Sequence, residues 1–516
     1  MPTTKTRLCD RPRRVIYNDD AGPRFTAKTR EELLGDRFDR TVGTDVDTYF
    51  KCVMSCWDPA VPALAKAEQY YIEAAREHDM EVWASVRMND VHDAHWPAEL
   101  WSADGSGPVD LSGTPGWGNL TQEQRHVESI FRPHRLKQTN PEMLTGEPRM
   151  RMNIDLAPRQ SIQHMTWSAF NYAYPQVRQY FLEQIEHWCR THDWDGLELD
   201  FIRMPVFFKS GEIEKNIPTM TGFVGEVRAL LDRIGAERGR PYPIAVHVPD
   251  APKYCLRCGL DIEAWMADDL VDLVVMGTAY RTHVQSYADF AALCHHHGVP
   301  AYPCFNCGPI NADETIDGKH VIERFRARVC GMLSEDVDGI AIFNLFASAV
   351  GGGLKGPLEE LNLVGDPVKK MAGLDKLYEA GTMDTWIDRE VLSDPPQRPR
   401  VVDQEPVDLK VGDPLESRYR EGKIKELRLE VRVSELLEEE SVIIKLNGQT
   451  VPIVGRRKQT SDTAMRGLEP GGWWFDAIAD APPARGGMNQ VTVIPGPGCM
   501  GKAISRVQNV HLWVKY

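Results

Sequence analysis

The sequence predicts an α/β protein, with a (β/α)8 TIM barrel followed by a small C-terminal antiparallel β-sandwich domain. In roughly the first 350 residues, short apolar runs alternate with longer amphipathic stretches, as in βα units built around a parallel sheet. Eight such runs occur, which is the number of strands that a TIM barrel needs. Beyond about residue 407, the segments are short and alternate apolar with polar residues, which is typical of antiparallel strands.

The apolar runs are the expected barrel strands. They lie at residues 14–19, 48–55, 81–89, 196–201, 244–249, 271–277, 300–306 and 339–346. Amphipathic segments that we expect to be helices lie between them, at 62–78, 175–192, 221–239 and 286–298. The last two end at Gly239 and Gly298, which are natural helix stops. A doubly wound open sheet would use similar strands and helices, so the count alone leaves that alternative open.

The domain boundaries follow from changes in composition. We expect the barrel to occupy residues 1–360, with a long insertion at about 91–170 that is rich in Gly, Pro, Trp and His. Because this insertion follows a strand, it would lie on the face that carries catalysis in TIM barrels. The Pro-rich range 361–406 is the expected linker, and 407–516 the expected sandwich.

Composition and charge argue against several classes of function. The formal net charge is -15, and Lys and Arg form no dense run, so we expect no nucleic-acid partner. No stretch of 18 apolar residues and no signal-peptide core occurs, so we expect no membrane partner and a cytoplasmic location. The 11 scattered cysteines fit a reducing compartment.

Two Cys-x-x-Cys pairs have the internal spacing of zinc sites. They are Cys255 with Cys258, and Cys304 with Cys307. About 45 residues separate the pairs, whereas the usual gap is roughly 15–20 residues. We therefore expect no metal and no cofactor.

Strand phase predicts which side chains point into the barrel. In GLELDF, the apolar set is Leu197, Leu199 and Phe201, so Glu198 and Asp200 should face inward, with Asp200 nearer the C-terminal mouth. Two buried carboxylates need partners. Arg87, on the neighbouring strand, is the expected partner of Glu198.

Further polar residues are directed to the same end of the barrel, or to the segments that follow its strands. The expected substrate-binding residues are Asn18, Asp20, Arg87, Asn89, Asp90, His92, Arg203, His247, Asn306 and Asn344. A purely structural barrel interior would instead be filled by layers of Val, Ile and Leu. The convergence of polar side chains therefore indicates a site for a polyhydroxylated ligand.

The segment DWDGLELDFIRMP at 193–205, with the segment 168–185 before it, resembles the bacterial barrel proteins called family 10 glycosyl hydrolase-like. In that group, an Asn followed by Pro-x-Val-Arg opens the helix before a DGxxxD strand. The matching positions here are Asn171, Pro175, Val177, Arg178, Asp195, Gly196 and Asp200. The segments 87–93 and 259–275 and the trailing β domain are also similar, so the resemblance covers most of residues 14–516.

The resemblance implies a barrel related to retaining α-glycosidases, in which the aspartate of the fourth strand is the nucleophile. Asp200 occupies that place. Those relatives carry their partner acid after the sixth strand, where the segment VVMGTAYRTH of this chain has no carboxylate.

These observations predict a glycoside hydrolase that cleaves an O-glycosidic bond in an oligosaccharide or polysaccharide, with Asp200 as nucleophile or base. Cleavage needs a second group on the other side of the bond. Candidates for it are Asp250, Asp20, Asp90 and His247. Asp250 is favoured because VHVPD places it at the barrel mouth, while Glu198 is kept as a catalytic candidate that mainly holds the site in shape.

Two alternatives stay open. One is a carbohydrate-binding barrel without catalysis, and the other is a metal-assisted hydrolase or lyase with Asp20, Asp200 and His247 as ligands. A carbohydrate is the expected partner, and a homo-oligomer is compatible with the sequence.

Overall fold

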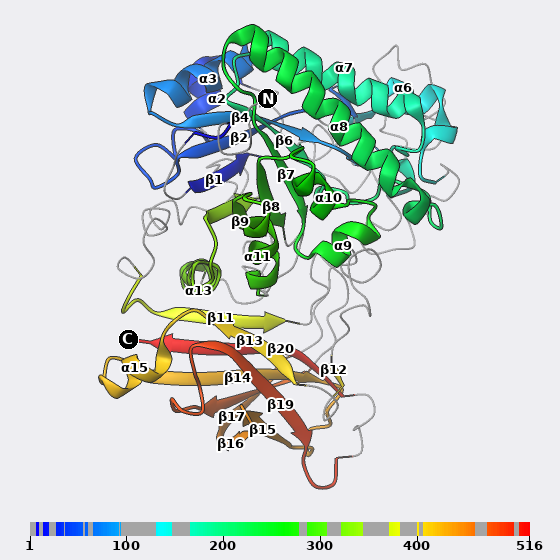
Figure 1. The fold of residues 1–516 in the computed structure, drawn as a ribbon. Coiled ribbons are helices and arrows are strands. Elements are labelled where there is room, and N and C mark those ends of the chain that lie inside the picture. The colour runs from blue at the N-terminus through cyan, green and yellow to red at the C-terminus, as the bar shows by residue number, and fades with distance from the viewer. Residues whose placement is uncertain are drawn as a thin grey trace.

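The computed structural model describes most of the barrel and sandwich residues. The described residues are 7–9, 14–19, 27–35, 37–54, 57–59, 66–91, 93, 131–146, 166–277, 286–306, 321–343, 371–381, 400–401, 406–459, 472–499 and 505–516. They form a closed parallel barrel, in the upper half of Figure 1, and two antiparallel sheets below it. The predicted fold class, a TIM barrel followed by a β-sandwich, is therefore confirmed.

The barrel strands run in the order β1-β10-β9-β8-β7-β6-β4-β2, and all eight adjacent pairs are parallel. Their bounds are β1 Arg14–Asp19, β2 Thr48–Met54, β4 Glu81–Arg87, β6 Gly196–Asp200, β7 Ile244–Pro249, β8 Leu273–Gly277, β9 Ala301–Asn306 and β10 Gly339–Phe343. Each lies within one of the eight predicted runs. Because the sheet closes on itself, the open doubly wound alternative is wrong.

The described helices surround this barrel. Their bounds are α2 Arg30–Gly35, α3 Ala67–Glu77, α6 Arg135–Thr139, α7 Pro175–Thr191, α8 Ile213–Arg238, α9 Pro252–Arg257, α10 Ile262–Ala267, α11 Ala288–His296 and α13 Val321–Leu333. Helix α7 begins at Pro175, where a missing N–H costs no hydrogen bond. Helix α8 begins before its predicted start and contains Pro218, then ends at Gly239 in a left-handed conformation. The described helices include none with the length and apolar character of a transmembrane span.

The segment that follows β4 returns to the barrel through short elements. Strand β5 (Phe131–Pro133) pairs with β3 (Trp57–Pro59), and the 3-10 turns η3 (Pro141–Met143) and η7 (Thr166–Ser168) come before α7.

Apolar side chains fill the barrel below its C-terminal end. This inner cluster consists of Ile16, Phe50, Trp83, Ala245, Leu273, Val275, Tyr302, Cys304, Ala341 and Phe343. A Cβ atom on Gly196 would lie 2.5 Å from the Trp83 ring, so the absent side chain leaves room for the indole. Leu197 and Leu199 of β6, which were predicted to face outward, do not belong to this inner cluster. They pack in the layer between the strands and the helices. The polar residues of β6 thus lie above an apolar plug.

The sandwich has one sheet in the order β11-β20-β14-β18-β17, with β12 also on β20, and a second in the order β13-β19-β15-β16. The bounds are β11 Lys376–Gly381, β12 Arg400–Val401, β13 Val407–Val411, β14 Glu426–Ser434, β15 Val442–Leu446, β16 Gln449–Val451, β17 Ile453–Gln459, β18 Gly472–Ile478, β19 Gly487–Pro495 and β20 Arg506–Lys515; the helix α15 is Leu415–Arg420. The turn between β15 and β16 has positive φ at Asn447 and Gly448, as its Asn-Gly sequence predicts.

Strand β11 lies inside the range 361–406 that was expected to be a linker. It pairs with β20 over its whole length and forms one edge of the larger sheet. The expected linker is therefore partly a strand, and the sandwich begins earlier in the chain than predicted.

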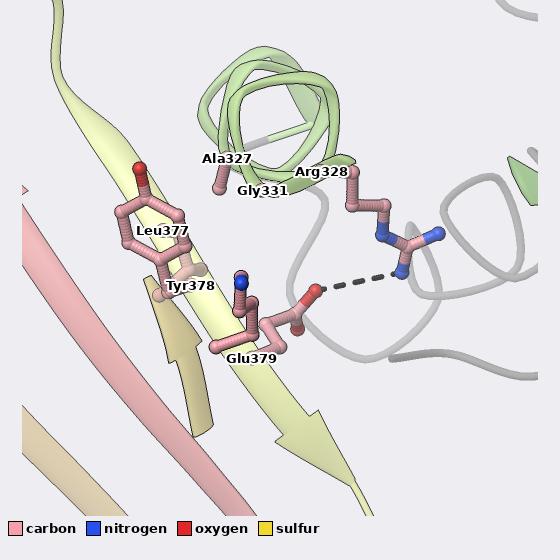
Figure 2. A pocket seen from close by; sticks show the side chains of 7 residues that line it. Ala327, Arg328, Gly331, Leu377, Tyr378 and Glu379 are labelled. Carbon is pink, nitrogen blue, oxygen red and sulfur yellow. Dashed lines mark ion pairs between the residues drawn. The ribbon is translucent and has the colours of Figure 1, made fainter. Parts of the chain in front are cut away.

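Helix α13 of the barrel lies against the sandwich edge strands β11 and β13, as Figure 1 shows. Ala327 on this helix belongs to the hydrophobic core of the sandwich. Figure 2 shows Arg328 reaching toward Glu379 of β11, at 3.6 Å, and Arg324 pairs with the same carboxylate at 3.1 Å. The small pocket between them, which Lys410 also lines, has about the size of one water molecule.

Backbone contact makes the same interface tight. A Cβ atom on Gly412, directly after β13, would lie 2.4 Å from both the carbonyl carbon and the oxygen of Cys330 in α13. Lys410 adds an ion pair with Glu335, at 2.7 Å. Barrel and sandwich are therefore packed through shared elements.

Candidate active site

Three polar residues align across neighbouring strands near the C-terminal end of the barrel. Arg87 of β4 is in register with Asp200 of β6, and Asp200 is in register with His247 of β7. Glu198 lies one inward position deeper on β6. All four side chains are almost fully buried.

Glu198 is held by an asparagine from across the barrel. Asn18 Nδ2 lies 3.0 Å from Glu198 Oε1 and 2.8 Å from Oε2. The predicted pairing of Glu198 with Arg87 is wrong. Arg87 instead bonds Asp90, three residues further on, with 2.6 Å between Nη1 and Oδ2. Asn18 and Asp90, both predicted to bind substrate, are thus bonded to Glu198 and Arg87.

Among the described residues, hydrogen-bond donors reach one of the two carboxylate oxygens of Asp200. Its Oδ1 accepts hydrogen bonds from the backbone N–H groups of Ile202 and Arg203, each at 3.1 Å. Its Oδ2 accepts none from any residue that the structure describes. Burial raises the pKa of Asp200 to about 6; the charge of Glu198 acts in the same direction, while His247 and Arg87 oppose it.

His247 lies beside both carboxylates of β6. Its Nδ1 is 3.5 Å from Glu198 Oε1 and 3.8 Å from Asp200 Oδ1. Burial disfavours the charged ring, but the neighbouring Cys304, Glu198 and Asp200 side chains together raise the pKa of His247 well above its usual range. The raised pKa favours the charged form of the ring, whose charge offsets part of that of the two carboxylates.

A second buried ionic group adjoins Asp90, and sequence reasoning missed it. Lys137 Nζ lies 2.8 Å from Asp93 Oδ2 and donates to the Asp90 carbonyl at 2.9 Å. Ser168 Oγ donates to Asp93 Oδ1 at 3.1 Å. Burial raises the pKa of Asp93 to about 6, against the charge of Lys137. Asp93 and Lys137 are 44 positions apart, and no periodic pattern connects them.

Asn89 was expected to bind substrate, and this prediction is wrong. Its Nδ2 donates to the carbonyls of Phe170 and Val206, at 3.0 and 2.7 Å, and its Oδ1 accepts from the Phe170 N–H at 2.9 Å. Both donors and the acceptor are thus used to tie the end of β4 to the segments before α7 and after β6.

The remaining predicted site residues either lie near Asp200 and His247 or fall outside the residues that the structure describes. Asp250 follows β7 directly and is 3% exposed, and its charge is one of those that raise the pKa of Cys255 in α9. Arg203 is partly exposed, and its backbone N–H holds Asp200. Asn306 is the last residue of β9. Asp20, His92 and Asn344 lie outside the described residues.

Among the described residues, no group of three or more His, Cys, Asp or Glu has the arrangement of a metal site. Asp20, one of the three ligands of the metal-assisted alternative, is outside that set. The loops after β4, β8, β9 and β10 are at least partly outside it as well. The described residues therefore define the floor of the site.

No family model matches the chain, and no curated protein matches it. Solved structures to which the chain has a weak similarity include a noncanonic maltogenic alpha-amylase from Thermotoga neapolitana (10% identity, 98% of this chain, 99% of that chain, TM-score 0.36). Others are a family GH18 chitinase from Chromobacterium violaceum (10% identity, 96% and 91%, TM-score 0.33) and a GH36 alpha-galactosidase from Geobacillus stearothermophilus (9% identity, 99% and 57%, TM-score 0.35). Similarity at this level does not establish a family, and the family 10 glycosyl hydrolase-like group is not shown by it.

Proposed function

We propose that the chain is a glycoside hydrolase that cleaves an O-glycosidic bond in an oligosaccharide or polysaccharide, with Asp200 as the nucleophile or base. One observation carries the proposal. At the catalytic end of a closed TIM barrel, Asp200 has one oxygen fixed by two backbone N–H groups and a second that accepts nothing from the described residues.

Comparison with three other buried carboxylates of this chain, Glu198, Asp93 and Asp19, supports that role. Glu198 accepts on both oxygens from Asn18, Asp93 on both from Lys137, and Asp19 on both from cations of its own neighbourhood. A buried structural carboxylate is expected to be satisfied in this way. A buried carboxylate oxygen without a hydrogen bond lowers the stability of the protein. Such destabilising groups are common at functional sites.

The ionisation of Asp200 suits a nucleophile or base. With a pKa of about 6, its carboxyl is ionised at neutral pH, yet it remains more basic than an ordinary aspartate. His247 and Arg87 offset part of the negative charge of the two β6 carboxylates. Asn18 fixes Glu198, so that the deeper carboxylate keeps its orientation while Asp200 reacts.

Asp250 is the proposed proton donor to the leaving oxygen, because it directly follows β7 at the same end of the barrel. A general acid matters most when the leaving group is a poor one. Asp250→Asn should therefore reduce kcat/KM on an oligosaccharide by roughly 10²- to 10⁴-fold. It should reduce kcat/KM much less on a 4-nitrophenyl glycoside, whose leaving group needs little protonation. Equal losses on both substrates would reject Asp250 as the acid.

The function is tested by a panel of 4-nitrophenyl glycosides and oligosaccharides, with both turnover and binding measured. The wild type should hydrolyse a member of the panel, and Asp200→Asn should bind it with similar affinity while losing at least about 10²-fold in kcat. A binding protein without catalysis would bind equally in both forms and turn over in neither, which would reject the proposal.

Asp272→Asn is a matched control for this test. Asp272 lies at the N-terminal end of β8, where it pairs with Arg7 and Arg228 at 2.8 and 3.1 Å. Burial raises its pKa to about 6, as for Asp200. Its replacement should leave the kcat of the folded protein unchanged, because it lies at the opposite end of the barrel.

A further inference from the structure

We propose that Gly277 is a positioning residue of this active site, because its missing side chain leaves the space in which the His247 ring lies beside Asp200. The proposal rests on the proposed function, since it assigns Gly277 a role through the residues that surround the reacting carboxylate. Gly277 is the last residue of β8, the strand next to β7.

The space is measured by the position that a Cβ atom would take. On Gly277, this atom would lie 2.5 Å from His247 Nε2 and 2.9 Å from its Cδ2. Real Cβ atoms essentially never come this close to another heavy atom. The ring is 1% exposed, and the Phe343 ring meets it edge-on, with 5.6 Å between centroids, so protein atoms rather than solvent surround it.

Backbone conformation does not explain the glycine. Gly277 is absent from the residues with positive φ and lies within a regular parallel ladder with β7 and β9. Glycine in a strand lowers stability and often marks a place where another group approaches closely. The approaching group here is an imidazole.

A side chain at position 277 would disturb two residues that adjoin Asp200, namely His247 and Ile202. His247 Nδ1 lies 3.5 Å from Glu198 and 3.8 Å from Asp200, so a displaced ring would leave the two carboxylates without that neighbouring charge. The same Cβ would lie 3.1 Å from Cγ1 of Ile202, whose N–H donates to Asp200 Oδ1. Gly277 therefore acts on the reacting carboxylate from a position that does not touch it.

A double-mutant cycle tests the proposal. The variants are Gly277→Ala, His247→Ala and the double variant, assayed from pH 4 to 9 on the glycoside that the 4-nitrophenyl panel identifies. Gly277→Ala should lower kcat by roughly 10- to 100-fold, change KM little, and move the acid limb of the pH profile. In the His247→Ala background, the same change should cost less than about 3-fold, because the clashing ring is gone.

The cycle also separates the two proposals. A Gly277→Ala variant with wild-type kcat and pH profile, or one whose loss is the same in both backgrounds, would overturn the role of Gly277. Wild-type kcat in Asp200→Asn would reject the proposed function instead. If Gly277→Ala does not fold but the double variant does, the steric conflict between the alanine and the His247 ring is shown directly.

A readout without turnover completes the test. Imidazole ¹⁵N NMR should show a pKa of His247 above the usual range in the wild type. In Gly277→Ala, the pKa of His247 should fall by about one unit or more, because the ring leaves the carboxylates. An unchanged titration would overturn the proposal even if no glycoside were hydrolysed.

Discussion

Asn18 Nδ2 lies within hydrogen-bond distance of both carboxylate oxygens of Glu198, at 3.0 and 2.8 Å. Asp200 lies two residues after Glu198 on strand β6. Its Oδ1 accepts hydrogen bonds from backbone N–H groups, and no described residue donates to its Oδ2. The two inward carboxylates of β6 therefore have different tasks. Glu198 is fixed in place, and Asp200 presents an oxygen.

The stability of Asp200→Asn tests this difference without a substrate. The folded-state pKa of about 6 lies above the ordinary value of 3.8, so the native state retains a proton that the unfolded state releases between these values. Stability contributed by this carboxyl is thus lost as pH rises through about 6. Replacement by Asn should stabilise the protein by up to about 3 kcal/mol at pH 7 and by little near pH 4. Melting temperatures at both pH values check this, and a lower melting temperature at pH 7 would contradict it.

Glu198→Gln should have the opposite effect. A Gln side chain keeps one acceptor oxygen and places an NH2 group against the NH2 group of Asn18, which leaves a buried donor unsatisfied. The expected loss of stability is about 1–3 kcal/mol, again measured by thermal unfolding at pH 7. Equal stabilisation by Asp200→Asn and Glu198→Gln would mean that the two carboxylates do not differ as described.

The pH dependence of kcat/KM should have an acid limb near pH 6. A nucleophile or base must be ionised, and the pKa of Asp200 is raised to about 6 by burial. Activity should therefore rise as pH increases through that value, since kcat/KM reports the free enzyme. Activity that instead falls across the same range would make Asp200 the proton donor.

The buried pair of Lys137 and Asp93 should contribute strongly to stability. Lys137→Met leaves the Asp93 carboxyl buried without its cation, and we expect a loss of roughly 3–5 kcal/mol. Adding Asp93→Asn should recover much of this loss in a double-mutant cycle. The surface pair of Arg30 and Glu77, 2.9 Å apart, is the control, and Arg30→Met should cost less than about 1 kcal/mol. Similar losses for the two pairs would contradict the role given to burial.

Gly412→Ala should loosen the sandwich from the barrel. Its Cβ would lie 2.4 Å from backbone atoms of Cys330, which cannot move without shifting α13. We expect a lower melting temperature and faster proteolysis between the two domains. Gly331→Ala is the control, because its Cβ would meet only Lys410 Cγ at 4.0 Å, an ordinary contact. A Gly412→Ala protein as resistant as the Gly331→Ala protein would show that this contact is not needed.

The sequence predicts the barrel well because buried parallel strands are continuous apolar runs, and these are easily recognised. Phase then predicts the face of each side chain, and Glu198, Asp200 and His247 all lie on the predicted face. Phase does not predict which polar groups pair within that face. Arg87 therefore bonds Asp90, three residues away on its own segment, rather than Glu198 on the next strand.

Contacts made by irregular segments could not be predicted. Asn89 has the inward phase of β4 but is used by the backbone of Phe170 and Val206, which no strand pattern brings to it. Lys137 pairs with Asp93 from a short helix in the insertion, where the spacing of apolar residues carries no signal. A buried lysine is unusual enough to suggest a partner only once its burial is known.

A crystal structure of Asp200→Asn with a bound oligosaccharide would show whether the side chain at position 200 faces the bond to be cleaved. The distance to measure is the one from the side chain at position 200 to the anomeric carbon of the sugar. We expect about 3–3.5 Å, with the sugar above the β6 carboxyls at the C-terminal end of the barrel. A sugar bound elsewhere, with the side chain at position 200 covered by protein and out of its reach, would contradict it.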